Sequence, residues 1–209
     1  MQLFNKRAIK NSFYHTWYLY PILTIIASIL WVWGFSAFHL PSNHQTLSIF
    51  LETNVQKDSI FYDIMNKKYD REKLRDITIS YSLKEQSGYY DKLRVALSTY
   101  DIMILTEDTL SGFVNQYENY LVNFDDYIKD NYLDGSHTYY KFNEEDYAVL
   151  IKEKQVEIYL NNYMSFYEDD NYYLVFCRGS SNLGKRYDEN NAYYDNALTY
   201  MNYLIKGEI

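Results

Sequence analysis

The fold of this chain is decided by three strand-like runs, at residues 46–52 (TLSIFLE), 76–83 (DITISYSL) and 101–105 (DIMIL). The first run is apolar and β-branched enough for a buried strand, and the third is a short apolar segment. The second alternates apolar and polar side chains, which is the period of a strand with one covered face. All three runs are therefore predicted to be strands of one sheet.

Helical patterns fill the two intervals between these runs. Start signals at residues 57–59 (KDS) precede apolar residues at helical spacing, and residues 89–97 place Tyr89, Leu93 and Leu97 on one face. A β-α-β-α-β order within about 60 residues is typical of a parallel sheet with right-handed crossovers. We therefore expect a three-layer α/β domain with a mainly parallel sheet over residues 46–209.

The second half of the chain is less regular. Residues 147–152 (YAVLIK) and 172–177 (YYLVFC) have the apolar character of buried strands, and residues 156–163 fit either a strand or a short helix. Further helical patterns lie at residues 110–120, 124–131 and 192–204. The last of these predicts a helix that closes the domain.

An uncharged apolar stretch precedes the domain. Residues 11–51 contain no Asp, Glu, Lys or Arg, and within them residues 17–38 are long enough, at about 1.5 Å per residue, to cross a bilayer. Aromatic residues gather near both ends, from Trp17 to Phe38, as they do at membrane interfaces. We expect a transmembrane helix over residues 17–38 with the lipid bilayer as its partner. A cleaved secretory signal peptide and a buried core helix are the alternatives.

The charges around this stretch predict its orientation. Lys6, Arg7 and Lys10 precede it, so the positive-inside rule places residues 1–16 in the cytoplasm as a tail. Residues 39–45 would then be a linker, and residues 46–209 an extracytoplasmic domain of a single-pass protein of the cell membrane. Beyond the first three cations, 17 basic residues face 28 acidic ones, which argues against a nucleic-acid partner.

The composition is otherwise that of a globular chain. Its 209 residues are 47% hydrophobic and 23% charged, which excludes wholesale disorder, and 26 of them are tyrosines. Most of these tyrosines are expected to serve packing within the fold. Two functional alternatives are stacking on sugars and contacts at a protein interface. The single cysteine, Cys177, lies in an apolar run and is predicted to be an inert buried thiol.

No motif of the chain predicts catalysis, a metal or a cofactor. Residues 179–185 (GSSNLGK) fit a phosphate-binding loop, but Arg186 stands where that loop needs Ser or Thr, so we expect a plain polar loop. The four histidines lack the spacing of metal ligands, and acid clusters such as residues 168–170 favour a solvated surface. Paired carboxylates for glycoside hydrolysis have no local signature here. We expect no enzyme activity, no metal and no cofactor.

The order of elements in residues 46–111 resembles the N-terminal lobe of the extracellular solute-binding proteins of ABC importers. In that family a helix like residues 89–97 leads into a short strand of the kind at residues 101–105. Residues 171–184 (NYYLVFCRGSSNLG) are similar to the family's return strand and the Ser-Asn loop after it. Family members usually have two lobes, whereas residues 125–170 leave little room for a second one. The resemblance therefore implies a single-lobe relative.

This resemblance implies a solute-binding-like or accessory subunit, non-enzymatic and associated with a membrane transporter. A small-molecule solute would then bind in the crevice at the carboxyl ends of the strands. The residues expected nearest to that crevice are Thr53, Asn54, Thr106, Glu107, Tyr139, Tyr140, Ser180, Ser181 and Asn182. Two other functions stay open: an exported hydrolase acting on glycan or peptide, and a structural protein-interaction module of a surface complex.

Overall fold

The computed structural model of the chain describes two compact units, residues 1–40 and 41–209, which are treated separately below. The described residues are 14, 16–39, 45–53, 74–162, 164–184, 187 and 195–206. Some sequence predictions fall outside them: the helix after residues 57–59, most of the linker at residues 39–45, the tail up to residue 13, Asn54, and Arg186 of the loop after residue 179.

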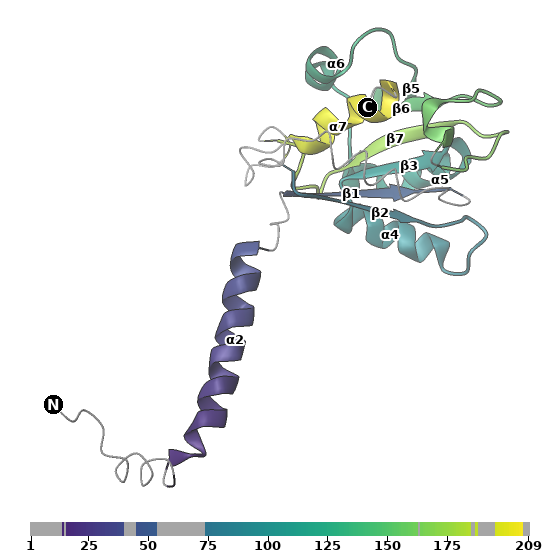
Figure 1. The fold of residues 1–209 in the computed structure, drawn as a ribbon. Helices are drawn as coiled ribbons and strands as arrows, with labels where there is room; N and C mark the ends of the chain where they lie inside the picture. Colours follow the sequence, from purple (N-terminus) through teal and green to yellow (C-terminus); the bar gives the residue numbers. More distant parts are fainter. Residues whose placement is uncertain are drawn as a thin grey trace. The chain divides into compact units, whose positions relative to one another are not determined.

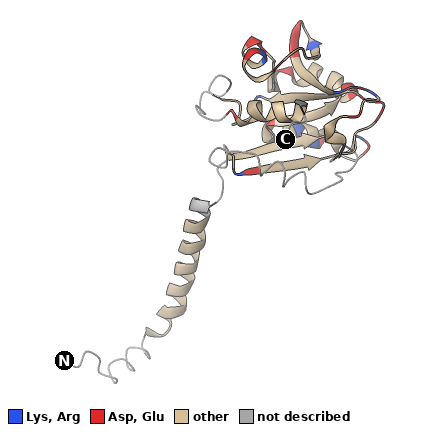
Figure 2. Cartoon of the chain, turned by 45° about the horizontal axis from the view of Figure 1, so that its top comes forward, with Lys and Arg blue, Asp and Glu red and all other residues tan. Residues whose placement is uncertain are grey.

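The first unit contains the helix α2 (Leu19–His39), in which the described side chains are largely exposed. In Figure 2 the described part of this helix has no residue coloured as Lys, Arg, Asp or Glu. The prediction of a transmembrane helix over residues 17–38 is wrong: within the described residues, no helix combines the length and the apolar character needed to cross a membrane.

The second unit is built on a seven-stranded mixed sheet (Figure 1). The strands are β1 (Thr46–Leu51), β2 (Asp76–Tyr81), β3 (Ile102–Thr106), β4 (Leu121–Val122), β5 (Tyr139–Phe142), β6 (Glu145–Lys152) and β7 (Tyr172–Cys177). Their order is β2-β1-β3-β7-β6-β5, and β4 pairs with β7. The strands predicted from the sequence are all present, with bounds that differ by a few residues.

The α/β class is confirmed, but the prediction of a mainly parallel sheet is wrong. Among the described strands, only β1 with β2 and β1 with β3 pair in parallel, whereas β7 runs antiparallel to β3, β4 and β6. The hairpin of β5 and β6 turns through Asn143 and Glu144, both with positive φ, as a tight two-residue hairpin requires. A continuous apolar run such as residues 172–177 reveals burial on both faces of a strand but not the direction in which the strand runs.

Helices cover both faces of the sheet. They are α4 (Tyr89–Thr99), α5 (Glu107–Tyr117), α6 (Asp126–Tyr132) and α7 (Asn196–Lys206), with short 3-10 turns at Glu118–Tyr120 and Tyr159–Asn162. Side chains alternate along β1, so that Leu47, Ile49 and Leu51 belong to one buried cluster and Phe50 to the other. The unit therefore has three layers, with the sheet in the middle.

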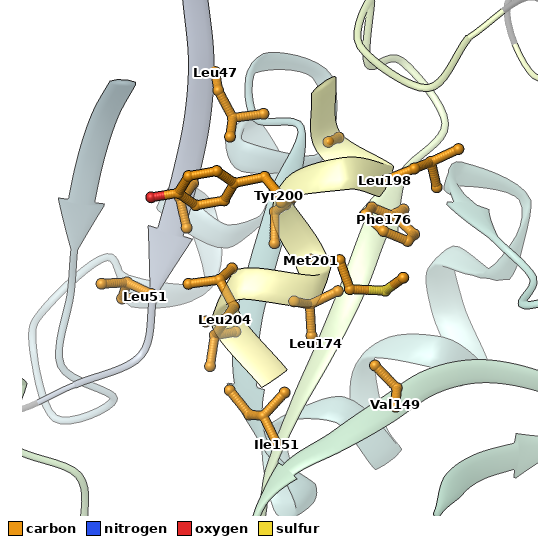
Figure 3. Close-up of a cluster of buried hydrophobic side chains, with 14 of the residues drawn as sticks. Leu47, Leu51, Val149, Ile151, Leu174, Phe176, Leu198, Tyr200, Met201 and Leu204 are labelled. Carbon is orange, nitrogen blue, oxygen red and sulfur yellow. The ribbon is translucent and has the colours of Figure 1, made fainter. Parts of the chain in front are cut away.

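Each layer of helices closes one of these clusters. On one face, Leu198, Met201 and Leu204 of α7 pack with Leu174 and Phe176 of β7 (Figure 3). On the other, α4 and α5 pack against β1, β3 and β7 through the buried side chains Leu93, Leu97, Leu110, Phe113 and Val114. Both faces of the central strands are buried, whereas the edge strand β2 alternates buried and exposed residues, which fixes its register.

Candidate functional site at the two edges of the sheet

The parallel strands define two edges of the sheet with different chemistry. The carboxyl ends of β1 and β3 lie at one edge, here the carboxyl edge, and their amino ends lie at the other, the amino edge. Because β7 is antiparallel to β3, its first residue Tyr172 pairs with Thr106 at the carboxyl edge. Its last residue lies at the amino edge, where the amide of Cys177 donates to the carbonyl of Asp101 (3.1 Å).

The sequence-predicted site residues are divided between these edges. Thr53, Thr106 and Glu107 follow or end β1 and β3 and lie at the carboxyl edge. Ser180, Ser181 and Asn182 follow β7, and the antiparallel direction of that strand carries them to the amino edge. Asn54 lies outside the described residues. The structure therefore does not bring the two groups into one crevice.

Tyr139 and Tyr140, the remaining predicted residues, lie on β5 as half-buried packing residues. The ring of Tyr139 packs against Phe124 and lies under the ammonium of Lys129, 5.0 Å from the ring centroid. Tyr140 makes an edge-to-face contact with Tyr173, with 5.7 Å between the centroids. Burial raises the pKa of both hydroxyls. The doublet points its two rings to opposite faces of the sheet, as neighbouring strand residues must.

A fully buried carboxylate, Glu52, lies at the carboxyl edge directly after β1. It accepts hydrogen bonds from the Thr106 amide (2.9 Å), the Thr109 hydroxyl (2.7 Å) and the Thr106 hydroxyl (3.2 Å). The Tyr89 hydroxyl is buried beside it without a hydrogen bond of normal geometry. Burial raises the pKa of Glu52 above its ordinary value, while these donated hydrogen bonds partly counter the rise. Glu52 therefore ties the end of β1 to β3 and α5.

Local capping explains why Thr106 and Thr109 meet Glu52. The Thr106 side chain accepts from the Thr109 amide (3.3 Å) and so caps the start of α5. Two acidic residues, Glu107 and Asp108, occupy the first turn, where the helix dipole favours negative charge. The site residue Glu52 was missed by sequence reasoning, although an acid immediately after a buried strand was a visible signal.

The carboxyl edge continues from β3 to the loops that flank β7. The Asn171 side chain donates to the Glu107 carboxylate (2.7 Å) and accepts from the Lys154 amide (2.8 Å). The Tyr167 hydroxyl reaches the Glu85 carboxylate (3.2 Å) in the turn after β2. These bonds hold the loop between β6 and β7 over the strand ends.

A cavity of about 600 Å³ opens in this loop at the end of β6. Its lining residues are Lys152, Gln155, Val156, Glu157, Asn161, Met164, Ser165, Phe166 and Glu168. Lys152 is 2% exposed, and its ammonium donates to the carbonyls of Glu153 (3.2 Å), Tyr167 (3.1 Å) and Asp170 (3.3 Å). The cavity thus has a buried cation among its walls.

Burial lowers the pKa of Lys152, although Asp170, Glu168 and Asp169 act in the opposite sense. Within the described part of the chain, no carboxylate forms an ion pair with this ammonium. Its partners are neutral carbonyl oxygens, so its positive charge is not cancelled at contact distance. In the sequence, Lys152 is a lysine at the end of an otherwise apolar strand. This pattern predicts the strand but does not by itself indicate a binding residue.

A second cavity, of about 380 Å³, lies at the amino edge. Its lining residues are Thr46, Ser48, Ser98, Thr99, Tyr100, Asp101, Gly179, Ser180 and Ser181. The carboxylate of Asp101, 5% exposed, accepts from the Ser48 amide (2.7 Å), the Ser180 hydroxyl (2.5 Å) and the Asn182 side chain (3.1 Å). Burial raises the pKa of Asp101, and the donated hydrogen bonds counter the rise.

Asn182 organises the amino edge around Asp101. Its side-chain amide also donates to the Thr46 carbonyl (3.0 Å), and its oxygen accepts from Asn196 at the start of α7 (3.1 Å). Two of the predicted residues, Ser180 and Asn182, therefore contact a buried carboxylate that sequence reasoning did not single out. The signal was the aspartate that directly precedes β3.

The buried ionisable groups do not form a catalytic arrangement among the described residues. Glu52, directly after β1, lies four residues from Ser48, whose amide contacts Asp101, or about 13 Å at the usual rise per residue. Glycosidase carboxylates lie about 5–9.5 Å apart. Burial raises the pKa of Cys177, which favours the protonated thiol. The described residues include no group of three or more His, Cys, Asp or Glu that would hold a metal.

Comparisons with protein-family models and with curated proteins identify no relative. No protein-family model matches the chain, and no curated protein matches it. The candidate sites rest on the geometry of the two edges.

Proposed function

We propose that residues 41–209 form a non-enzymatic binding domain for a small polar solute, with the binding site at the carboxyl edge. The observation that carries the proposal is the cavity of about 600 Å³ beside Lys152. Its volume falls within the range of about 300–1,000 Å³ that is usual for small-ligand pockets. In open α/β sheets, ligands bind outside the carboxyl ends of the strands.

The lining chemistry favours a zwitterionic solute such as an amino acid. The Lys152 ammonium attracts a carboxylate, and its bonds of 3.1–3.3 Å lie at the long end of the usual range, so they can be shared with a ligand oxygen. Two exposed acids of the lining, Glu157 and Glu168, attract an ammonium group. Gln155 and Asn161 add amide donors and acceptors for the remaining polar atoms.

The resemblance to solute-binding proteins suggests a partner for such a binding domain, namely a membrane transporter. The parallel arrangement of β1, β2 and β3 and the return strand β7 are compatible with the elements on which that resemblance rests. We propose a solute-binding-like or accessory subunit that works with a membrane transporter. The two buried carboxylates, Glu52 and Asp101, lie at different edges, so this pair does not form the paired arrangement of a glycoside hydrolase.

A thermal-shift experiment on the full chain tests this function. We expect amino acids without a charged side chain to raise the melting temperature, with a gain of about 2.7 kcal/mol in the free energy of unfolding at a ligand concentration 100-fold above Kd. Neutral sugars should have no effect. The variant Ser165→Trp fills the cavity without changing charge and should abolish the shift.

The matched control is Ser98→Trp, at an exposed position of α4 in the wall of the other cavity. It should keep the full amino-acid response. The proposal fails if no amino acid stabilises the chain, or if both tryptophan variants respond like the wild type.

A further inference from the structure

The cavity at the amino edge differs in its charged groups from the cavity beside Lys152, whose lining combines that lysine with Glu157 and Glu168. Among the described residues that line it, Asp101 is the one charged side chain, and seven of these nine residues carry a hydroxyl group. None of these nine described residues is Lys, Arg or His. A ligand in this cavity would meet one carboxylate surrounded by neutral oxygen atoms.

The negative charge of Asp101 has neutral partners in the described part of the chain. Its three hydrogen-bond donors are a backbone amide, the Ser180 hydroxyl and the Asn182 amide. The oxygen Oδ1 accepts two of these bonds and Oδ2 accepts one, the bond from Ser48. Since a carboxylate has about four lone-pair sites, Oδ2 keeps capacity for a further donor.

The C-terminus of α4 adds to the negative potential of this cavity. Ser98, Thr99 and Tyr100 line the cavity at the point where α4 ends. A helix C-terminus carries a partial negative charge of about half a unit, and the last turn of α4 contains no basic residue to balance it. The helix end and the carboxylate therefore favour the same kind of ligand, a cation.

We propose that the amino-edge cavity binds a small organic cation through a primary ammonium group. A volume of about 380 Å³ exceeds what a bare metal ion needs and falls within the range of small-ligand pockets. An ammonium group has three donors, which match Asp101 and the hydroxyl oxygens around it. This site is separate from the solute site beside Lys152 and does not depend on it.

Calorimetric titration of the full chain with 1,4-diaminobutane tests the proposal. We expect saturable binding of the diamine and none of 1,4-butanediol, which has the same carbon chain but no charge. Equal binding of the diol would overturn the proposal, and so would the absence of diamine binding. Displacement of the diamine by KCl or MgCl₂ at matched ionic strength would show an inorganic-cation site and overturn the organic ligand class.

Two variants locate the site. Ser98→Lys places an ammonium at the exposed end of α4 and should weaken diamine binding by about tenfold or more, a change of about 1.4 kcal/mol. Asp101→Asn removes the charge at nearly constant shape and should weaken it by at least as much. If Asp101→Asn fails to fold, Ser98→Lys still decides the question because its side chain is exposed.

The matched control is Asn115→Lys, which makes the same change of charge on the exposed face of α5 outside the cavity lining. It should keep the wild-type affinity. The chain has a net charge of −8, so equal weakening by both lysine variants would show general attraction of the diamine and overturn the proposed site.

Discussion

The carboxyl edge and the amino edge of this sheet each hold one buried carboxylate, but the two are used differently. Glu52 is buried and accepts hydrogen bonds from Thr106 and Thr109. It lines neither the cavity beside Lys152 nor the cavity at the amino edge. Asp101 makes a comparable set of hydrogen bonds and still lines a cavity. Burial and hydrogen bonding of an acid are therefore insufficient to mark a ligand site.

The two cavities differ because the buried charged residues in their walls have opposite signs. The carboxyl-edge cavity contains the Lys152 ammonium, whereas the amino-edge cavity contains the Asp101 carboxylate. The wall of one cavity thus includes a buried cation, and the wall of the other includes a buried anion. On this comparison, Glu52 is a structural link, and Lys152 and Asp101 are the charges that a ligand would meet.

The largest expected effect is the loss of stability on removing the structural link. Glu52→Ala leaves the donors of Thr106 and Thr109 without a partner and opens a void, so we expect a loss of about 3 kcal/mol in the free energy of unfolding. Urea denaturation measures it. Glu157→Ala, at an exposed glutamate, should change stability by less than about 0.5 kcal/mol. Equal effects of the two variants would refute the structural role of Glu52.

Breaking the hydrogen-bond network at the amino edge should lower the free energy of unfolding somewhat less than Glu52→Ala does. Asn182→Ala removes bonds to Asp101, Thr46 and Asn196, and we expect a loss of about 2 kcal/mol. The same denaturation experiment compares it with Asn115→Ala, which removes an exposed side chain on α5. A loss for Asn182→Ala no larger than that of the control would show that Asn182 does not hold the edge together.

An intermediate effect concerns the charge of Glu52 and its dependence on pH. Because burial raises the folded-state pKa above the ordinary value of 4.5, protonated Glu52 contributes stability that is fully present below that value. This contribution is lost as the pH rises through the folded-state pKa. Glu52→Gln keeps the shape and lacks the charge, so its stability relative to the wild type should rise over that interval and then level off. A difference independent of pH would contradict the raised pKa.

The smallest expected effect is a gain of stability at the end of α4. Ser98→Lys places a cation beside the helix C-terminus, and we expect a gain of about 0.5 kcal/mol at low ionic strength. Thermal unfolding in low and high salt measures it, with Ser98→Gln as the uncharged control. A gain that persists unchanged in high salt would have a cause other than the negative potential at this edge.

Much of the fold was predictable because its signals are periodic. The alternation along β2 (Asp76–Tyr81), the apolar run of β7 and the helical spacing of α4 each describe burial within one segment, and all three elements formed as expected. The direction of β7 was not predictable, since an apolar run is the same in either direction. The short strands β4 and β5 were missed because neither has a distinct period.

The candidate sites were less predictable because they depend on register. Thr106 and Ser180 were expected in one crevice, but the antiparallel direction of β7 places them at opposite edges. Glu52, Asp101 and Lys152 each lie at the end of an apolar strand, where one polar residue is easily taken for a boundary. Their roles follow from which strand ends lie together, and that information is not contained in any one segment.

Chemical-shift mapping by NMR tests the central claim of this comparison most directly. The full chain is titrated with the amino acid that gives the largest thermal shift, and backbone amides of both edges are followed. We predict saturable changes at residues 152–168 and none at residues 98–101 and 179–181. Changes confined to the amino edge, or no saturable change with any amino acid, would contradict the assignment of the solute site to the carboxyl edge.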